Sequence, residues 1–299
     1  MTWRVKTPIT FLFSDIVFVR RKCLGCVFKI EPILCVLCAF VVNKYFRGYM
    51  KKSIVVLFIG LLLTASHVQA ESADEIIRKA DLKMRGQSSY TEMTMQIKRP
   101  AWTRSMGMKA WTKDQNYSLV LVTAPAQDKG SSSLKRFKEM WNWVPNIERI
   151  IKIAPSMLGQ SWMGSDFTND DLINQSSIVV DYTHTLIKEE RFDKAPCWVI
   201  ESIPKPDAPV VWGKQVLWIS KGEYNMRKVE YYDEFEDLIN TMSTFDVTML
   251  GGRKIPARQE MQPADKPDQK TILLYHKAQF DFDIPTDFFS QKNMRDLRI

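Results

Sequence analysis

Apolar and polar residues alternate along most of the chain beyond residue 86, as they do in strands with one buried and one solvent-exposed face. Two such strands are expected over 90–99 and 102–112, joined by a turn at Arg99-Pro100-Ala101. About ten or eleven strands in succession predict an antiparallel sheet. The remaining strands are expected over 116–123, 131–143 (as one or two), 183–191, 197–203, 214–220, 227–232, 240–250, 254–262 and 271–281.

Helical periodicity is confined to short segments. Residues 72–84 place Ile76, Ile77 and Ala80 on one face and end before Gly86, which predicts an amphipathic helix. Further short helices are expected over 155–163, through Ile173 after a capping box at 168–171, and over 290–297. The fold class is therefore mainly β (α+β): a strongly curved antiparallel sheet that forms an incomplete β-barrel closed by a few helices.

Residues 50–70 contain the three parts of a secretory signal peptide in the expected order. Lys51-Lys52 begins it, an apolar run follows over 54–63, and Ala70 supplies the small residue that a signal peptidase needs. The run is shorter than the roughly 20 residues that span a bilayer. We therefore expect export, cleavage near Ala70 and one mature domain over 71–299; a membrane anchor or buried helix is the alternative.

Residues 1–49 precede this signal peptide and contain two further apolar runs, over 11–19 and 33–42. A domain upstream of a complete signal peptide is unusual. We expect translation to begin at Met50, which would make 1–49 an over-extended gene model. The alternative is that the two apolar runs anchor the protein in a membrane.

Residues 1–70, which precede the expected cleavage site, account for the apparent basic charge of the chain. The whole sequence has 42 Lys+Arg and 34 Asp+Glu, a formal net charge of +8. Residues 1–70 hold 10 of the basic and 2 of the acidic residues, which leaves 32 of each over 71–299. Because the mature part is neutral, we expect no nucleic-acid partner.

The cysteines follow the same division. Cys23, Cys26, Cys35 and Cys38 have the CxxC…CxxC pattern of a zinc site. Their short separation and apolar neighbours make a zinc ribbon difficult to build. The mature part keeps only Cys197, which cannot form an internal disulfide.

Motifs for catalysis and metal binding are sparse over 71–299. His184 and His276 have no nearby ligand pair, so neither a metal site nor a cofactor is expected. Ser161 lies between Gly159 and Gly164 in a segment with one residue too many for a nucleophile elbow. We therefore expect that the protein is not an enzyme.

Large, adaptable apolar side chains are abundant, since the mature part holds 13 Met and 8 Trp. Methionine is flexible and polarisable, which suits a surface that repacks around acyl chains. A wide sheet with few helices leaves a concave face that is hard to fill, and an apolar concavity is a candidate binding site. A filled core is the alternative. The residues expected to line the cavity or its lid are Met93, Met95, Ile97, Met106, Met108, Trp141, Trp143, Trp162 and Met163.

A family resemblance rests on several short segments: Arg99-Pro100, Trp111, Pro125 with Lys129-Gly130, Trp141-Asn-Trp143-Val-Pro145, and Gly164-Ser165-Asp166-Phe167 followed by Asp171-Leu172. In these the chain resembles the bacterial outer-membrane lipoprotein-sorting-protein-like family, related to the periplasmic lipoprotein carrier and its outer-membrane receptor. The resemblance covers nearly all of 71–299. It implies a periplasmic protein with an incomplete β-barrel whose interior takes a lipid or acyl chain. Asp166 is then expected to brace a loop and Arg104, if it points inward, to gate the cavity.

Together these observations predict a monomeric periplasmic carrier or chaperone for a lipid, an acyl chain or an acylated protein. It would serve outer-membrane lipid or lipoprotein trafficking, or an inner-membrane exporter. One alternative is an accessory protein of an envelope transporter complex that binds no lipid. Another is a lipid hydrolase that uses Ser161 or an acid pair that the sequence does not reveal.

Overall fold

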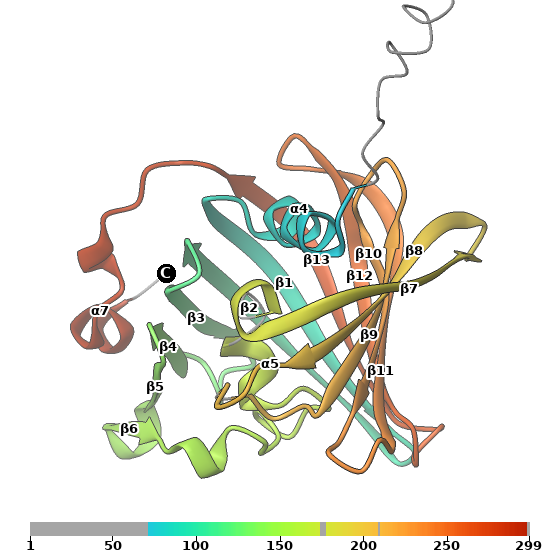
Figure 1. Ribbon diagram of the computed structural model, residues 1–299. Helices are drawn as coiled ribbons and strands as arrows, with labels where there is room; N and C mark the ends of the chain where they lie inside the picture. Colours follow the sequence, from blue (N-terminus) through green and yellow to red (C-terminus); the bar gives the residue numbers. More distant parts are fainter. Residues whose placement is uncertain (1–70, 174–177, 209, 298–299) are drawn as a thin grey trace, which may run out of the picture. The chain divides into compact units, whose positions relative to one another are not determined.

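The computed structural model describes residues 71–173, 178–208 and 210–297. The expected signal peptide and the segment before it lie outside the described residues. Within them, thirteen strands form one antiparallel sheet that is not closed into a barrel (Figure 1). No helix in the described ranges combines the length and apolar character needed to cross a membrane.

Two meanders of strands meet where β1 pairs with β13. The first consists of β1 (Ser88–Arg99), β2 (Trp102–Lys113), β3 (Tyr117–Ala124), β4 (Ser132–Arg136), β5 (Glu139–Val144) and β6 (Arg149–Ile153). The second consists of β7 (Tyr182–Phe192), β8 (Ala195–Pro204), β9 (Lys214–Ser220), β10 (Met226–Tyr232), β11 (Leu238–Leu250), β12 (Arg253–Pro263) and β13 (Lys270–Phe280). Since β6 and β7 are the two edges of the sheet, the segment that joins them connects one edge of the half-barrel to the other.

Two β-bulges bend the centre of the sheet at the same level. The register shifts between Glu92 and Met93 where β1 pairs with β13, and between Gly107 and Met108 where β2 pairs with β3. Met93 and Met108 lie directly opposite each other. An extra residue in one strand bends it and increases its twist, so the two bulges add curvature around this methionine pair.

The expected amphipathic helix is α4 (Ala73–Arg85), which packs on β7, β9 and β12 (Figure 1). The Ser72 side chain accepts a hydrogen bond of 3.2 Å from the Glu75 amide at its start. At its end, Gly86 has φ of 68° and donates its amide to Leu82 at 2.9 Å. Ile76 and Ile77 are buried, as the periodicity predicts.

The predicted capping box is confirmed at the start of α5 (Asn169–Ile173). The Thr168 amide donates to the Asp171 carboxylate at 2.8 Å, and the Asp171 amide donates to the Thr168 hydroxyl at 3.0 Å. A short helix, α6 (Ile178–Asp181), leads into β7. The expected closing helix is α7 (Gln291–Asp296), with Ser290 as its N-cap.

One local expectation is wrong, and one strand was not expected. Residues 155–163 do not form an α-helix, because only Pro155–Met157 makes a 3₁₀ turn. The chain then folds into a tight loop in which the Trp162 amide donates to the Phe167 carbonyl at 2.8 Å. The edge strand β6 was not expected, because four of its five residues are exposed or half-buried and its apolar residues do not alternate.

Buried side chains pack against both faces of the sheet. Neighbouring residues of a strand point to opposite faces. On β4, Leu134 belongs to an outer cluster that includes Met294 of α7, whereas Lys135 faces the inner side. The inner cluster includes Ile76 and Ile77 of α4. The sheet therefore has α4 on its inner face and α7 on the outer face of β4 and β5.

Candidate functional site

A cavity of about 230 Å³ lies between α4 and the inner face of the sheet. Its wall is mainly apolar and combines residues from α4, from the first four strands and from β9 to β13. Five methionines line it: Met84, Met93, Met108, Met226 and Met242. The other apolar residues of the wall include Ala80, Ala110, Val120, Leu217, Val229, Leu273, Tyr275 and Phe280.

The cavity occupies one part of the inner face, and the other part is filled. Met95, Ile97 and Met106 have no exposed surface and do not line the cavity. They belong to the same buried cluster as Trp162 and Phe167 of the loop between β6 and β7. This loop fills the concavity at one end, and the cavity remains under α4.

The residues predicted to line a cavity therefore divide into groups. Met93, Met108 and Trp162 line it, whereas Met95, Ile97 and Met106 are core residues beside it. Met163 is half-buried, packs on the inner cluster and has a φ of 50° in the loop.

Trp141 and Trp143 require a correction, since neither lines the cavity. They lie on β5 and pack in the outer cluster with Leu134 and Phe289. Met140, their neighbour on β5, packs in the inner cluster instead. Residues 141 and 143 share a face, and that face is covered by α7 and the chain before it. The two tryptophans therefore form an outer layer and no lid.

Charged side chains converge on one side of the cavity. Asp81 and Arg85 of α4 form an ion pair of 2.7 Å, with 8% and 16% of their side chains exposed. Asp114 lies in the turn after β2, and Asp170 lies on α5. Lys135 of β4 completes the wall and has only 6% of its surface exposed. Burial lowers the pKa of Lys135 to about 8, although Asp170 raises it.

The carboxylate of Asp171 is fully bonded within the protein. It accepts hydrogen bonds from the Thr168 amide at 2.8 Å and from the Trp212 indole at 2.9 Å. Burial raises the pKa of Asp171, and these two donors oppose that rise. Trp212 in turn packs on the Tyr231 ring at 5.0 Å between centroids. This carboxylate therefore orients the cavity wall.

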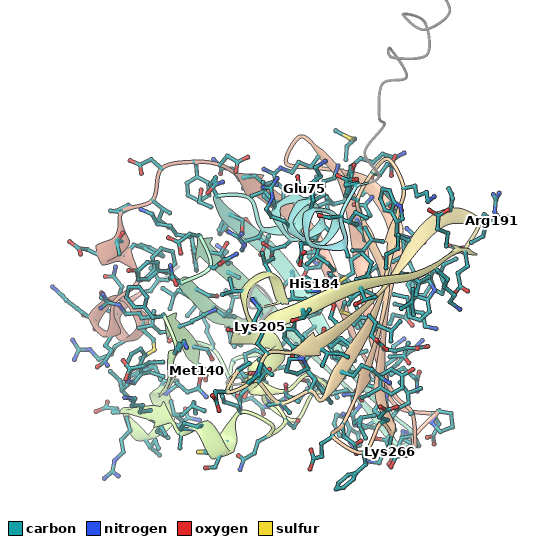
Figure 2. All side chains as sticks on the ribbon, in the orientation of Figure 1. Glu75, Met140, His184, Arg191, Lys205 and Lys266 are labelled. Carbon is teal, nitrogen blue, oxygen red and sulfur yellow. The ribbon has the colours of Figure 1, made fainter. Side chains whose placement is uncertain are left out.

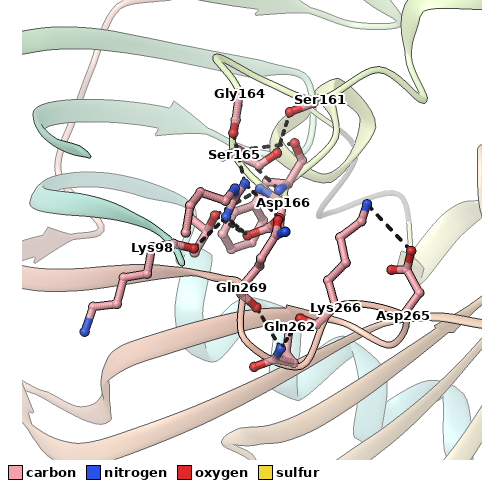
Figure 3. Close-up of polar contacts among 12 residues, drawn as sticks. Lys98, Ser161, Gly164, Ser165, Asp166, Gln262, Asp265, Lys266 and Gln269 are labelled. Atoms are coloured by element: carbon pink, nitrogen blue, oxygen red, sulfur yellow. Dashed lines mark hydrogen bonds and ion pairs between the residues drawn. The ribbon is translucent and has the colours of Figure 1, made fainter. Parts of the chain in front are cut away.

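Arg99 and Asp166, from two of the segments that carry the family resemblance, bind each other (Figure 3). The two terminal guanidinium nitrogens of Arg99 each donate to the Asp166 carboxylate at 3.0 Å, and one of them also donates to the Gly164 carbonyl at 3.1 Å. The Thr271 hydroxyl of β13 donates to Asp166 at 2.7 Å. These bonds tie the loop that contains Trp162 to β1 and β13.

Arg104 lies on the inner face of β2, opposite Ile97. Its guanidinium pairs with Asp128, in the loop after β3, at 2.5 Å. It does not line the cavity, so its role as a gate stays a prediction.

The hydroxyl of Ser161 donates to the Ser165 carbonyl. Both histidines of the described part bond elsewhere. His184, on β7 beside α4 (Figure 2), shares a 2.8 Å hydrogen bond with Ser202, and His276 shares one of 2.8 Å with Thr94. Ser161 is therefore engaged with the backbone of its own loop.

Sequence reasoning missed Lys135, Asp170 and the Asp81–Arg85 pair. Alternation places Lys135 on the solvent side of β4, because Leu134 beside it is apolar. Helical periodicity likewise assigns Asp81 and Arg85 to the polar face of α4. The only sign in the sequence that Lys135 could be buried is that it stands next to Leu134 in a short strand.

A family model with the description "-like: Uncharacterized protein" matches residues 114–296. The matched region begins after β2 and includes β3 to β13 and α7. No curated protein matches the sequence.

Three solved structures have the same fold. A DUF1329 family protein from Desulfovibrio piger has a TM-score of 0.68 and 22% identity, over 74% of this chain and 97% of its own. A putative outer membrane lipoprotein-sorting protein domain from Vibrio parahaemolyticus has 0.67 and 21%, over 75% and 98%. A LolA superfamily protein from Nitrosomonas europaea has 0.65 and 23%, over 75% and 100%. The expected resemblance to lipoprotein-sorting proteins is confirmed as a shared fold.

Proposed function

We propose that residues 71–299 of this chain, which belongs to the family whose model matches residues 114–296, form a periplasmic carrier. Its cargo would be a lipid, an acyl chain or an acylated protein. The cargo would be held between α4 and the inner face of the half-barrel. The likeness to a lipoprotein-sorting domain and a LolA superfamily protein supports this choice.

The observation that carries the proposal is the apolar cavity under α4. Shielding an acyl chain from water is worth about 0.8 kcal/mol for each buried CH₂ group. At about 230 Å³ the cavity is below the roughly 300–1,000 Å³ of drug-sized pockets, which favours one slender chain over a bulky ring system. Its five methionines suit a wall that repacks around chains of different length.

Release of the cargo needs a movable wall, and α4 is the natural candidate. Ala80 and Met84 of α4 face the cavity. The backbone of the helix is bonded to the sheet near its end, where the Arg253 guanidinium of β12 donates to the carbonyls of Leu82 at 2.8 Å and Lys83 at 3.0 Å. A small tilt of α4 would open the cavity and leave the strand ladder intact. A carrier also needs an acceptor with higher affinity for the cargo, such as an outer-membrane receptor or an exporter component.

The contacts of Ser161 and the two histidines favour a carrier over a hydrolase. A serine nucleophile needs a general base within hydrogen-bond reach. Ser161 donates to a backbone carbonyl, and His184 and His276 are bonded to other side chains. The alternative is an accessory protein of an envelope transporter complex that binds no lipid, and the test below distinguishes it from a carrier.

Native mass spectrometry of 71–299, purified from the periplasm without delipidation, tests the proposal. We expect adducts in the mass range of lipids or fatty acids, which disappear after delipidation and return on adding acyl ligands. A protein without adducts that also fails to take up any acyl ligand would contradict the carrier. Ester turnover that is lost in Ser161→Ala would support the hydrolase instead.

A further inference from the structure

A second cavity, of about 340 Å³, lies on the outer face of the sheet and shares no lining residue with the cavity under α4. Its wall includes Leu121 of β3, Trp143 of β5, Pro145 just beyond that strand and Leu297 after α7. Because α7 packs on β4 and β5, the cavity lies next to the end of that helix (Figure 1). Its volume is at the lower end of the roughly 300–1,000 Å³ of small-molecule sites.

The indole N–H of Trp143 has no hydrogen-bond partner among the described residues, although its nitrogen is closed to bulk water. Only 8% of the Trp143 surface is exposed. The other buried tryptophans, Trp162, Trp212 and Trp218, each donate the indole N–H to a protein oxygen. Since buried donors are nearly always bonded, an acceptor from the cavity that Trp143 lines would supply the missing partner.

Lys129 is the one charged residue among the described residues that line this cavity. It lies in the loop after β3, and no carboxylate of the described residues pairs with its ammonium. The neighbouring carboxylate, Asp128, is held by Arg104 at 2.5 Å. The described wall therefore offers one positive charge and an unpaired indole donor, without an acidic side chain.

A carboxylate matches these two donors. It has a single negative charge and two acceptor oxygens, and its bond to an ammonium is strengthened by the opposite charges. A phosphate brings three strong acceptor oxygens and up to two charges, more than one ammonium neutralises. The side chains of Leu121, Pro145 and Leu297 provide apolar contacts for the rest of the ligand.

We propose that the outer cavity is a second ligand site, which binds a small apolar carboxylate. One carboxylate oxygen pairs with the Lys129 ammonium and the other accepts the indole N–H of Trp143. The hydrocarbon part packs on Leu121, Pro145 and Leu297. The site does not depend on the carrier function, because the two cavities lie on opposite faces of the sheet and have different walls.

The indole N–H signals of the protein over 71–299, labelled with ¹⁵N in its tryptophans, test the proposal in a titration with phenylacetate. The eight tryptophans of this part give eight signals, and Trp143→Phe identifies the one from residue 143. We expect phenylacetate to move this signal to higher frequency, because a hydrogen bond to a carboxylate deshields the proton. Neutral phenylacetamide should bind at least about tenfold more weakly, a difference of about 1.4 kcal/mol.

Lys129→Met should remove the preference for the acid and keep the affinity for the amide. Lys129 is exposed, so the variant should fold, and calorimetry measures both affinities without the signal assignment. The matched control is Lys138→Met in the exposed turn after β4, which changes the net charge equally and should keep the preference. Met93→Trp, in the wall of the other cavity, should also bind phenylacetate like the wild type.

Equal affinity for acid and amide, or a preference that survives in Lys129→Met, would overturn the proposal. A Trp143 signal that does not move while the acid binds would show that the carboxylate lies elsewhere. An indole proton of Trp143 that exchanges magnetisation with a bound water, and that phenylacetate does not displace, would show that a water alone fills the site. None of these results would affect the carrier function, which is tested separately.

Discussion

The Asp166 carboxylate is a junction between three parts of the chain. It accepts hydrogen bonds from Arg99 of β1 and Thr271 of β13, and its own amide donates to the Thr271 hydroxyl at 2.9 Å. Side-chain exposures of 14% for Arg99 and 8% for Asp166 leave little water to replace the pair. The Gly-Ser-Asp-Phe segment thus positions a loop, and Phe167 beside Asp166 fills the core.

Asp166→Asn should lower the free energy of unfolding by about 2–3 kcal/mol. It removes one charge of a largely buried pair and leaves the Arg99 guanidinium without its anion. Urea denaturation followed by tryptophan fluorescence measures the change. The control is Asp265→Asn, whose partner Lys266 is 3.6 Å away and whose side chain is 73% exposed, so that less than about 0.5 kcal/mol is expected. Equal losses in the two variants would contradict the bracing role.

Lys135 and Leu134 show where prediction from single positions ends. Alternation along β4 correctly assigns the two side chains to opposite faces. It wrongly assumes that one of those faces meets water, because α7 covers Leu134 and the cavity encloses Lys135. The helix that covers Leu134, α7, lies more than 150 positions away in the sequence, so the residues of β4 carry no information about it.

Individual elements followed their local signals closely. The Ser72 cap and the Gly86 stop set the ends of α4, and the Thr168–Asp171 box sets the start of α5. Hairpin strands formed where the alternation is regular. The signals failed over 155–163, where hydrogen bonds to Phe167, Asn169 and Asp170 replace those of a helix, and at β6, where an edge strand has little to bury.

The tryptophans of β5 belong to the outer layer, so their removal should affect stability and leave cargo exchange unchanged. Trp143→Ala should cost about 3–4 kcal/mol, because a large side chain that is 8% exposed leaves a void beneath α7. Thermal denaturation and the exchange rate of a fluorescent fatty acid are measured together. Trp102→Ala, at a position 50% exposed, is the control with a loss below about 1 kcal/mol. Faster exchange with an unchanged melting temperature would restore the tryptophans as a lid.

The whole described part is an open half-barrel whose free edges are linked by the segment between β6 and β7. An open sheet leaves an inner face that no second sheet covers. In this protein a loop fills one part of that face and α4 roofs the other, which leaves the cavity. The sequence predicted the curved sheet and the apolar concavity. It did not predict which part of the inner face is filled and which part is cavity, because Met93 and Met95 differ only in the chain segment that covers them.

The proposed carrier function also requires export, because a periplasmic protein is processed before it functions. We predict that the protein recovered from the periplasm begins at Glu71. Intact mass and N-terminal sequencing measure this directly. Replacing Ala70 with a bulky residue, as in Ala70→Tyr, should slow processing and shift the mass upward. A mature N-terminus upstream of Met50 would show instead that residues 1–49 are part of the working protein.

Titration of a fluorescent fatty acid into delipidated 71–299 and its Met93→Trp variant tests whether the cavity under α4 holds the cargo. Met93 is half-buried on the cavity wall, so an indole there should occupy the space that the chain needs. We predict a loss of affinity of at least about tenfold with a melting temperature close to that of the wild type. Met249→Trp, on a side chain that is 63% exposed, should bind like the wild type. Unchanged affinity in a folded Met93→Trp protein would show that the cavity under α4 does not hold the cargo.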